Sequence, residues 1–318
     1  MILRSVAAKP AGRLQQSASR LRDPYNLPMS AHVLPLRHFL LALAVVAVWG
    51  TNFVVIKLAF AHLPPLLFGA LRFTFAVLPM VFFLPRPAAS WRNLAAYGLL
   101  IGVGQFGLLY IAMNGHISPG LASLVIQSQV LFTIFLSMHI SHEHVKPVQW
   151  FALALAIAGI GVIAAHTDGT TTLTGLVLIL VAAGCWSAGN MVNKQAGRVN
   201  MVAYVVWSSL FAAPPLFVLS LIFEGWPAIS TGLREADLGT WAAVFWQTIG
   251  NSLFGYAVWG WLLARYPAAT VTPMALLVPV FGMAASSGWL GESMPAWKLM
   301  AMVLVMGGLA INLWKRAG

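Results

Sequence analysis

The sequence has little charge. Charged residues make up 8% of its 318 residues and hydrophobic residues 60%, whereas a water-soluble domain has about 25% charged residues. Because so few charges cannot cover a folded chain with a wetted surface, a soluble globular protein is excluded. We therefore expect an all-α membrane protein with most of its chain in lipid.

Cysteine is nearly absent as well. The single cysteine, Cys185, lies in an apolar stretch, so an intramolecular disulfide is excluded and a small packing side chain is expected. A single cysteine does not indicate whether the protein lies in a reducing or an oxidising compartment.

Acidic residues are rare, and none lies in the middle of an apolar stretch. The seven are Asp23, Glu143, Asp168, Glu224, Glu235, Asp237 and Glu292, all in the N-terminal tail or in predicted loops. A proton relay of the usual Asp/Glu kind is therefore not expected, nor is an intramembrane enzyme with paired carboxylates. The formal net charge of +11 does not indicate a nucleic-acid partner, because the basic residues lie in tails and short loops rather than on one folded face.

What the sequence does contain is a series of ten apolar stretches, each near the roughly 20 residues that a membrane-spanning helix requires. They cover residues 38–58, 64–84, 94–112, 118–140, 147–165, 173–193, 201–223, 238–262, 269–290 and 296–314. The connections are mostly short, so neighbouring helices are expected to be antiparallel. Residues 1–37 are basic and poor in apolar residues, and are expected to form a disordered tail or an extension upstream of a start at Met29.

Lysine and arginine are distributed unequally between the two sides of the predicted bundle. Fourteen lie in the tails and loops on the side of the N-terminus, and only Arg234 lies in the loops on the opposite side. Because cytoplasmic loops are enriched in Lys and Arg, both termini are predicted to face the cytoplasm.

Repeated motifs indicate that the chain is duplicated. Residues 49–57, WGTNFVVIK, return in altered form at residues 186–194, WSAGNMVNK, and Pro119, Glu143 and Gly159 are echoed by Pro267, Glu292 and Gly308. We therefore predict a first repeat at 38–165 and a second at 173–314. With five helices in each, the second repeat is inverted relative to the first, which is typical of secondary transporters with a site at the midplane. Duplication without transport is the alternative.

Arg72 is the exception among the charges, because it lies eight residues after Pro64 and so roughly 12 Å inside the second apolar stretch. A charge inside the membrane is costly and usually faces the bundle interior or a wet cavity. Its guanidinium can attract a carboxylate-bearing substrate, or it can bond to backbone carbonyls or extend outward. The sequence leaves both roles open.

Polar side chains follow helical spacing inside several stretches. The groups that share a face are Trp186, Asn190 and Asn193; Ser123 and Gln127; and Ser252, Tyr256 and Trp259, while Asn52 and Gln105 add two amides. Such side chains either line a polar cavity or join helices, each bond being worth about 0.6 kcal/mol. The candidates for the substrate path are Arg72, Asn52, Gln105, Gln127, Asn190, Tyr256 and Trp259. This set favours a small neutral or zwitterionic substrate over an apolar drug.

Three histidines, His139, His142 and His144, surround Glu143 at the end of the fourth stretch. Imidazole and carboxylate groups can bind a metal, but the sequence lacks the i, i+4 histidine pair with a catalytic Glu that would indicate one. We predict no metal or other cofactor, and expect the cluster to be a polar cap at the membrane interface.

An ordered set of short motifs spans both repeats. It comprises WGTNFVVIK (49–57), LPPL (63–66), LRF (71–73), GLASLV (120–125) with Gln127 and Gln129, FTI (132–134), GNMVNK (189–194), GYAVWG (255–260) and LLVPV (276–280). On these motifs the chain from about 38 to 314 resembles the EamA branch of the drug/metabolite transporter superfamily. The resemblance implies a ten-helix carrier in the bacterial inner membrane that exports cysteine, O-acetylserine or other amino acids by alternating access.

The leading hypothesis is thus an exporter of amino-acid metabolites and not an enzyme. A carrier of the same fold for drugs, sugars or organic cations is the first alternative, although a cation carrier is expected to need an intramembrane acid. An enzyme that acts at the membrane interface through the histidine cluster is the second. The expected partners are a small-molecule substrate and the lipid bilayer, and assembly into a homodimer is left open.

Overall fold

The computed structural model describes residues 34–141, 147–167, 169–197, 199–266 and 268–314. Every regular element within these residues is helical. The predicted N-terminal tail up to residue 33 and the histidine cluster with its Glu143 lie outside the described residues, apart from the backbone of His139 on α6.

The first half of the chain supplies seven α-helices and three irregular helical segments. They are α1 (Leu36–Ala59), α2 (Pro65–Val77), η1 (Met80–Phe82), α3 (Trp91–Gly98), η2 (Leu99–Gly107), α4 (Leu108–Met113), α5 (Pro119–Val125), η3 (Ile126–Ser128), α6 (Gln129–Ser141) and α7 (Pro147–Ala165). The second half consists of α8 (Leu173–Gln195), α9 (Met201–Ser209), α10 (Ala213–Phe223), α11 (Gly225–Glu235), α12 (Leu238–Phe245), η4 (Trp246–Phe254), α13 (Gly255–Arg265), α14 (Ala268–Val271), η5 (Thr272–Leu276), α15 (Leu277–Leu290) and α16 (Ala296–Trp314).

Eight helical segments of the described chain are long and apolar enough to cross a membrane. They correspond to the first seven predicted stretches and to the ninth. The eighth stretch is helical from Leu238 to Arg265, but four polar side chains are buried in its middle: Gln247, Thr248, Asn251 and Ser252. The tenth, α16, has a shorter apolar part, Ala296–Ile311. The structure is therefore that of an all-helical, multi-pass membrane protein.

The seventh predicted stretch, 201–223, is interrupted between Ser209 and Ala213, where α9 ends and α10 begins. Pro214 and Pro215 cannot donate backbone hydrogen bonds to the preceding turn, and they occupy the first turn of α10. Sequence reasoning placed these prolines inside one span. The structure shows that they begin a separate helix.

The two halves share unusual local structure. Each of α3 and α12 has 8 residues and runs directly into a π-helical segment of 9 residues, η2 or η4. In both halves a short 3-10 segment, η3 or η5, then interrupts the next apolar stretch. Because π-helical segments are rare, their equal lengths at corresponding positions support the predicted duplication.

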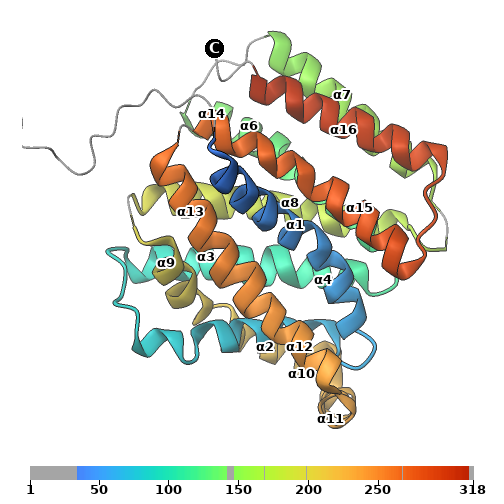
Figure 1. Cartoon of the computed structure of the whole chain (residues 1–318). Coiled ribbons are helices and arrows are strands. Elements are labelled where there is room, and N and C mark those ends of the chain that lie inside the picture. Colours follow the sequence, from blue (N-terminus) through green and yellow to red (C-terminus); the bar gives the residue numbers. More distant parts are fainter. Residues whose placement is uncertain (1–33, 142–146, 168, 198, 267, 315–318) are drawn as a thin grey trace, which may run out of the picture.

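Close packing of α7 and α16 joins the last helices of the two halves, which lie side by side along one edge of the bundle (Figure 1). A Cβ added to Gly308 would lie 2.5 Å from the carbonyl oxygen of Ala152, and one added to Gly159 would lie 2.7 Å from Val305 Cγ2. Only glycine allows this approach, since real Cβ atoms do not come so close. The two echoed glycines therefore both allow α7 and α16 to pack closely, each against residues of the opposite helix.

The bundle has two chemically different ends. Arg37, Arg86, Arg92, Lys194 and Arg265 lie at the end where α1 begins, which we name the basic end. The opposite end carries Glu224, Glu235, Asp237 and Glu292, and we name it the acidic end. These four are all the carboxylate residues among the described part of the chain, so none lies at mid-bundle there.

Candidate functional site

Arg72 is buried in the middle of the bundle, on α2, with 1% of its surface exposed. Its Nη1 donates to the hydroxyl of Tyr110 (2.7 Å) and its Nη2 donates to the hydroxyl of Ser252 (2.8 Å). The guanidinium carbon lies 4.0 Å from the centre of the Phe106 ring, a distance at which the ring attracts a cation. The Nε–H group has no hydrogen-bond partner among the residues that the structure describes. Arg72 is thus held in place, but its charge is only partly compensated.

No carboxylate that the structure describes bonds to Arg72. Glu292 Oε1 lies 2.8 Å from Lys298 Nζ, and Asp237 Oδ1 lies 3.9 Å from His62 Nδ1. Glu224 accepts hydrogen bonds from the first turn of α2 at the acidic end. The guanidinium of Arg72 is therefore a buried cation without a carboxylate partner among the described residues, an arrangement that is costly in free energy.

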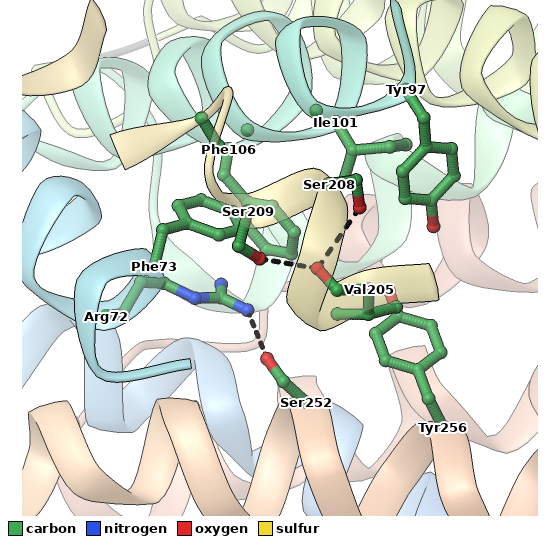
Figure 2. A pocket seen from close by; sticks show the side chains of 13 residues that line it. Arg72, Phe73, Tyr97, Ile101, Phe106, Val205, Ser208, Ser209, Ser252 and Tyr256 are labelled. Atoms are coloured by element: carbon green, nitrogen blue, oxygen red, sulfur yellow. Dashed lines mark hydrogen bonds between the residues drawn. The ribbon is translucent and has the colours of Figure 1, made fainter. Parts of the chain in front are cut away.

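Arg72 forms part of the wall of a narrow pocket between the two halves of the chain (Figure 2). The lining consists of Arg72, Phe73, Tyr97, Gly98, Ile101, Gly102, Phe106, Val205, Ser208, Ser209, Ala212, Ser252 and Tyr256. The volume of the pocket is about 10 Å³, which is roughly enough for one water molecule. In this conformation the pocket is therefore closed to a molecule as large as an amino acid.

Corresponding positions of the two halves line this pocket. Arg72 lies eight residues after the N-cap of α2, Pro64, and Ser208 lies eight residues after the N-cap of α9, Asn200. The hydroxyls of Ser208 and its neighbour Ser209 donate to the carbonyl oxygen of Val205 (3.1 and 2.7 Å), as Figure 2 shows. The pocket therefore has one charged wall from the first half and one hydroxyl-rich wall from the second.

The π-helical segments supply further residues of the pocket. Phe106 comes from η2, and Ser252 comes from η4. The Ser252 hydroxyl donates to the carbonyl of Gln247 (3.0 Å), five residues earlier, which is the spacing of a π-helix. Such segments are frequent at functional sites because they widen a helix locally. Both halves thus deliver an irregular helix to the same pocket.

Two of the predicted site residues, Arg72 and Tyr256, line this pocket together. Asn52, Gln105 and Gln127 are buried, with 4%, 5% and 7% of their surfaces exposed, but they are not part of its lining. The amide oxygens of Asn52 and Gln105 have no hydrogen-bond partner. These three amides therefore lie outside the pocket in this structure.

The other two predicted residues lie elsewhere. Asn190 is half-buried on α8, and the ring of Trp259 packs against that of Trp49 with centroids 5.2 Å apart. Sequence reasoning missed several residues that bond to Arg72 or line the pocket: Tyr97, Tyr110, Phe106, Ser208 and Ser209. The adjacent serines just before the Pro214–Pro215 pair are the signal that could have found the second wall.

No metal centre is found in the described chain, where no three His, Cys, Asp or Glu side chains come together. The predicted cluster around Glu143 falls in the part that the structure does not describe. The absence of a cofactor accordingly stays a prediction.

Replacing Gln105 tests the free-energy cost of burying an amide oxygen that has no hydrogen-bond partner among the described residues. Because its buried Oε1 has no partner, and a buried unsatisfied group costs about 1–3 kcal/mol, we expect Gln105→Leu to raise the free energy of unfolding by about 1 kcal/mol. We expect transport to fall in the same variant if the amide meets the substrate. Thermal unfolding in detergent and uptake by vesicles measure the two effects, and a lowered Tm would contradict the first.

Glu292 at the acidic end holds the two halves together. Its carboxylate accepts hydrogen bonds from the Ser118 and Ser286 hydroxyls, the backbone N–H of Gly120 and Lys298 Nζ. Burial alone raises the pKa of this carboxyl, but the hydrogen bonds and the charge of Lys298 outweigh it and hold the pKa below the ordinary value of 4.5. The folded protein therefore favours the ionised form.

This pKa shift predicts a dependence of stability on pH. Because the pKa of Glu292 is lower in the folded chain, its carboxylate stabilises the fold above the ordinary pKa, and the contribution is lost as the pH falls through the folded pKa. We expect the Tm to fall on acidification below pH 4.5. The Glu292→Gln variant should show a smaller fall, and equal pH profiles for the two proteins would contradict the assignment.

The helical bundle with a central pocket between two matched halves defines a membrane carrier of duplicated fold. The EamA-like transporter family matches residues 36–165 and 173–314, so this chain belongs to that family. It is 40% identical over 280 residues to a Salmonella typhimurium protein described as a probable amino-acid metabolite efflux pump, covering 86% of this chain and 94% of that protein. An Escherichia coli (strain K12) protein with the same description is 38% identical over 287 residues, covering 87% and 96%. A crystal structure that is 18% identical shares the fold, with a TM-score of 0.60 over 88% of this chain and 98% of that one.

Proposed function

We propose that this protein exports small amino-acid metabolites across the bacterial inner membrane, and that Arg72 binds the carboxylate of the substrate. The observation that carries the proposal is the buried Arg72 guanidinium, which has an unpartnered Nε–H and no carboxylate partner among the described residues. A carboxylate is the anion whose geometry suits a guanidinium fork. The descriptions of the Salmonella and E. coli relatives support the same class of substrate.

The remaining lining suits the rest of an amino acid. The rings of Tyr97 and Tyr256 face the same pocket, and an aromatic face attracts an ammonium group. The Ser208 and Ser209 hydroxyls offer further hydrogen bonds on the opposite wall. A cationic drug is disfavoured, because all described carboxylates lie at the acidic end.

We propose ten membrane-spanning helices arranged as two inverted repeats, 38–165 and 173–314, with both termini in the cytoplasm. The eight clear spans, the helical segments of the eighth and tenth stretches, and the matching π-helical segments support this arrangement. The excess of Lys and Arg at the basic end supports placing that end in the cytoplasm.

Transport then proceeds by alternating access. The pocket has room for about one water molecule in this conformation, so a substrate can reach Arg72 only when the two repeats move apart at one end. Repeats that rock around a central site are the usual mechanism of inverted-repeat carriers. We assign the present conformation to a state closed at both ends.

Uptake of radiolabelled cysteine and O-acetylserine into inside-out vesicles tests the proposal, because export in the cell corresponds to uptake in such vesicles. Vesicles that contain the protein are expected to accumulate label above vesicles without it. The assay is run with and without a pH gradient to learn whether transport depends on it. No uptake of any amino acid from a wider panel by well-incorporated protein would contradict the proposal.

A further inference from the structure

A second cavity lies at the basic end of the bundle. Helix α3 contributes residues both to this cavity and to the Arg72 pocket. The cavity lies between the first turns of α3 and the last turns of α8, and its volume is about 440 Å³. The wall consists of Ala88, Ala89, Ser90, Arg92, Asn93, Ala96, Val192, Gln195 and Ala196. A cavity of this size accepts a small molecule, and Arg92 places a cation in its wall.

Three side chains in mutual contact connect this cavity with the Arg72 pocket. Asn93 lines the cavity and Tyr97, one helical turn later on α3, lines the pocket. Tyr204 of α9 lies against both: its hydroxyl donates to Asn93 Oδ1 (2.6 Å), and its ring packs edge-on against Tyr97 with centroids 4.8 Å apart. Tyr204 is fully buried and Tyr97 nearly so. Asn93, Tyr204 and Tyr97 thus form a continuous series of contacts from the cavity to the pocket.

Asn93 also joins the two halves of the chain. Its Nδ2 donates to the carbonyl oxygen of Val192 on α8 (2.7 Å), while its Oδ1 accepts from Tyr204 on α9. Since α3 belongs to the first family match and α8 and α9 belong to the second, both bonds cross between the halves. Any separation of the halves at the basic end must break them.

We propose that Asn93, Tyr204 and Tyr97 form the inner gate of the carrier, and that the cavity beside Arg92 is the vestibule in which a carboxylate-bearing substrate waits. The proposal rests on the proposed function for the identity of the substrate and the orientation. The gate itself rests on the hydrogen bonds and ring contact between the two spaces. When Asn93 releases Val192 and Tyr204, the Tyr204 ring can leave Tyr97 and open the path to Arg72.

Thiol labelling tests the gate without any substrate. The native cysteine is replaced by Cys185→Ser, and Ser209→Cys then places a reporter thiol in the Arg72 pocket. A charged, membrane-impermeant thiol reagent is added to inside-out vesicles, where it meets the basic end in the proposed orientation. We expect Asn93→Ala to raise the labelling rate on the order of tenfold, because it removes both cross-repeat bonds, and Tyr204→Phe to raise it less, because it removes one.

Asn193→Ala is the matched control. Asn193 lies near Val192 at the same end of α8, but its Nδ2 donates to the sulfur of Met201 (3.6 Å), within the second half. Unchanged labelling in this control together with faster labelling in Asn93→Ala supports the gate. Equal labelling rates in all the variants, or an equal rise in Asn193→Ala, would overturn it. Since no substrate is present, failure of the cysteine assignment cannot mimic either result.

Discussion

Replacing Arg72 with alanine is expected to lower the rate of carboxylate uptake by roughly 10- to 100-fold while leaving the protein in the membrane. A hydrogen bond to a charged group contributes about 1.5–3 kcal/mol, and each 1.4 kcal/mol corresponds to about a factor of ten. The expectation follows from the burial of Arg72 in the central pocket without a carboxylate partner. The measurement is the initial uptake rate in inside-out vesicles, normalised to the amount of incorporated protein.

Two variants separate the charge of Arg72 from its shape. Arg72→Lys keeps the positive charge but loses the planar fork, so uptake is expected to fall less than in Arg72→Ala. Tyr110→Phe removes one hydroxyl that accepts from Arg72 (2.7 Å) without altering the charge, and is expected to have the smallest effect. Wild-type uptake by Arg72→Ala would contradict the assignment. Poor incorporation of both Arg72 variants would instead show that the guanidinium is structural.

The largest expected loss of stability follows Glu292→Ala. The Glu292 carboxylate and the Lys298 ammonium form a pair at 2.8 Å whose side chains are only 9% and 4% exposed. Removing one partner of a buried pair leaves an uncompensated charge and costs roughly 3–5 kcal/mol. The loss also leaves the Ser118 hydroxyl and the Gly120 N–H without an acceptor. Thermal unfolding of the detergent-solubilised protein, followed by tryptophan fluorescence, measures the effect.

Two further variants test whether the loss of stability comes from breaking the Glu292–Lys298 pair. Glu235→Ala removes an exposed carboxylate at the same end, so its Tm is expected to match that of the wild type. Adding Lys298→Met to Glu292→Ala removes the stranded ammonium and should recover part of the stability. If Glu292→Ala and Glu235→Ala unfold at the same temperature, the pair does not hold the helices together as described.

The sequence was informative where a single residue breaks a strong rule. A charge inside an apolar stretch singled out Arg72 while leaving its role open, and the structure shows it buried in the wall of the central pocket. The echo of Gly159 and Gly308 indicated a duplication, and both glycines lie where α7 and α16 pack closely. The low content of charge predicted a chain that lies mostly in lipid, and the ten apolar stretches of spanning length predicted that it is helical.

Helical periodicity relates side chains reliably only within a regular helix. The spacing of Ser252, Tyr256 and Trp259 predicted one polar face. Ser252 and Tyr256 line the pocket, and the rings of Tyr256 and Trp259 both pack against Trp49, with centroids 6.0 and 5.2 Å away. A π-helical turn changes the angle between successive side chains, and η4 ends just before Tyr256. A pattern based on 3.6 residues per turn therefore applies to Tyr256 and Trp259, which both lie in the regular helix α13, but it does not extend across η4 to Ser252.

Contacts between residues that are far apart in the chain could not be predicted from the sequence. Tyr110 bonds to Arg72 from a different helix, and Tyr204 reaches Asn93 across 111 positions. In the sequence, Tyr110 and Tyr204 are tyrosines within apolar stretches, and no local pattern indicates their partners, because these come close only when the helices pack. The same holds for Glu224 and Glu292, which were predicted only to lie in loops, whereas the structure shows that they bind the first turns of α2 and α5.

The central claim is that Arg72 recognises the substrate carboxylate, and binding of an acid and its ester tests it most directly. Isothermal titration compares cysteine with cysteine methyl ester on the wild type and on Arg72→Gln, or another amino acid and its ester if vesicle uptake selects one. We predict that the wild type binds the acid at least about tenfold more tightly than the ester, from the strength of charged hydrogen bonds, and that this preference disappears in Arg72→Gln. The same ratio of acid to ester affinity in both proteins would contradict the claim.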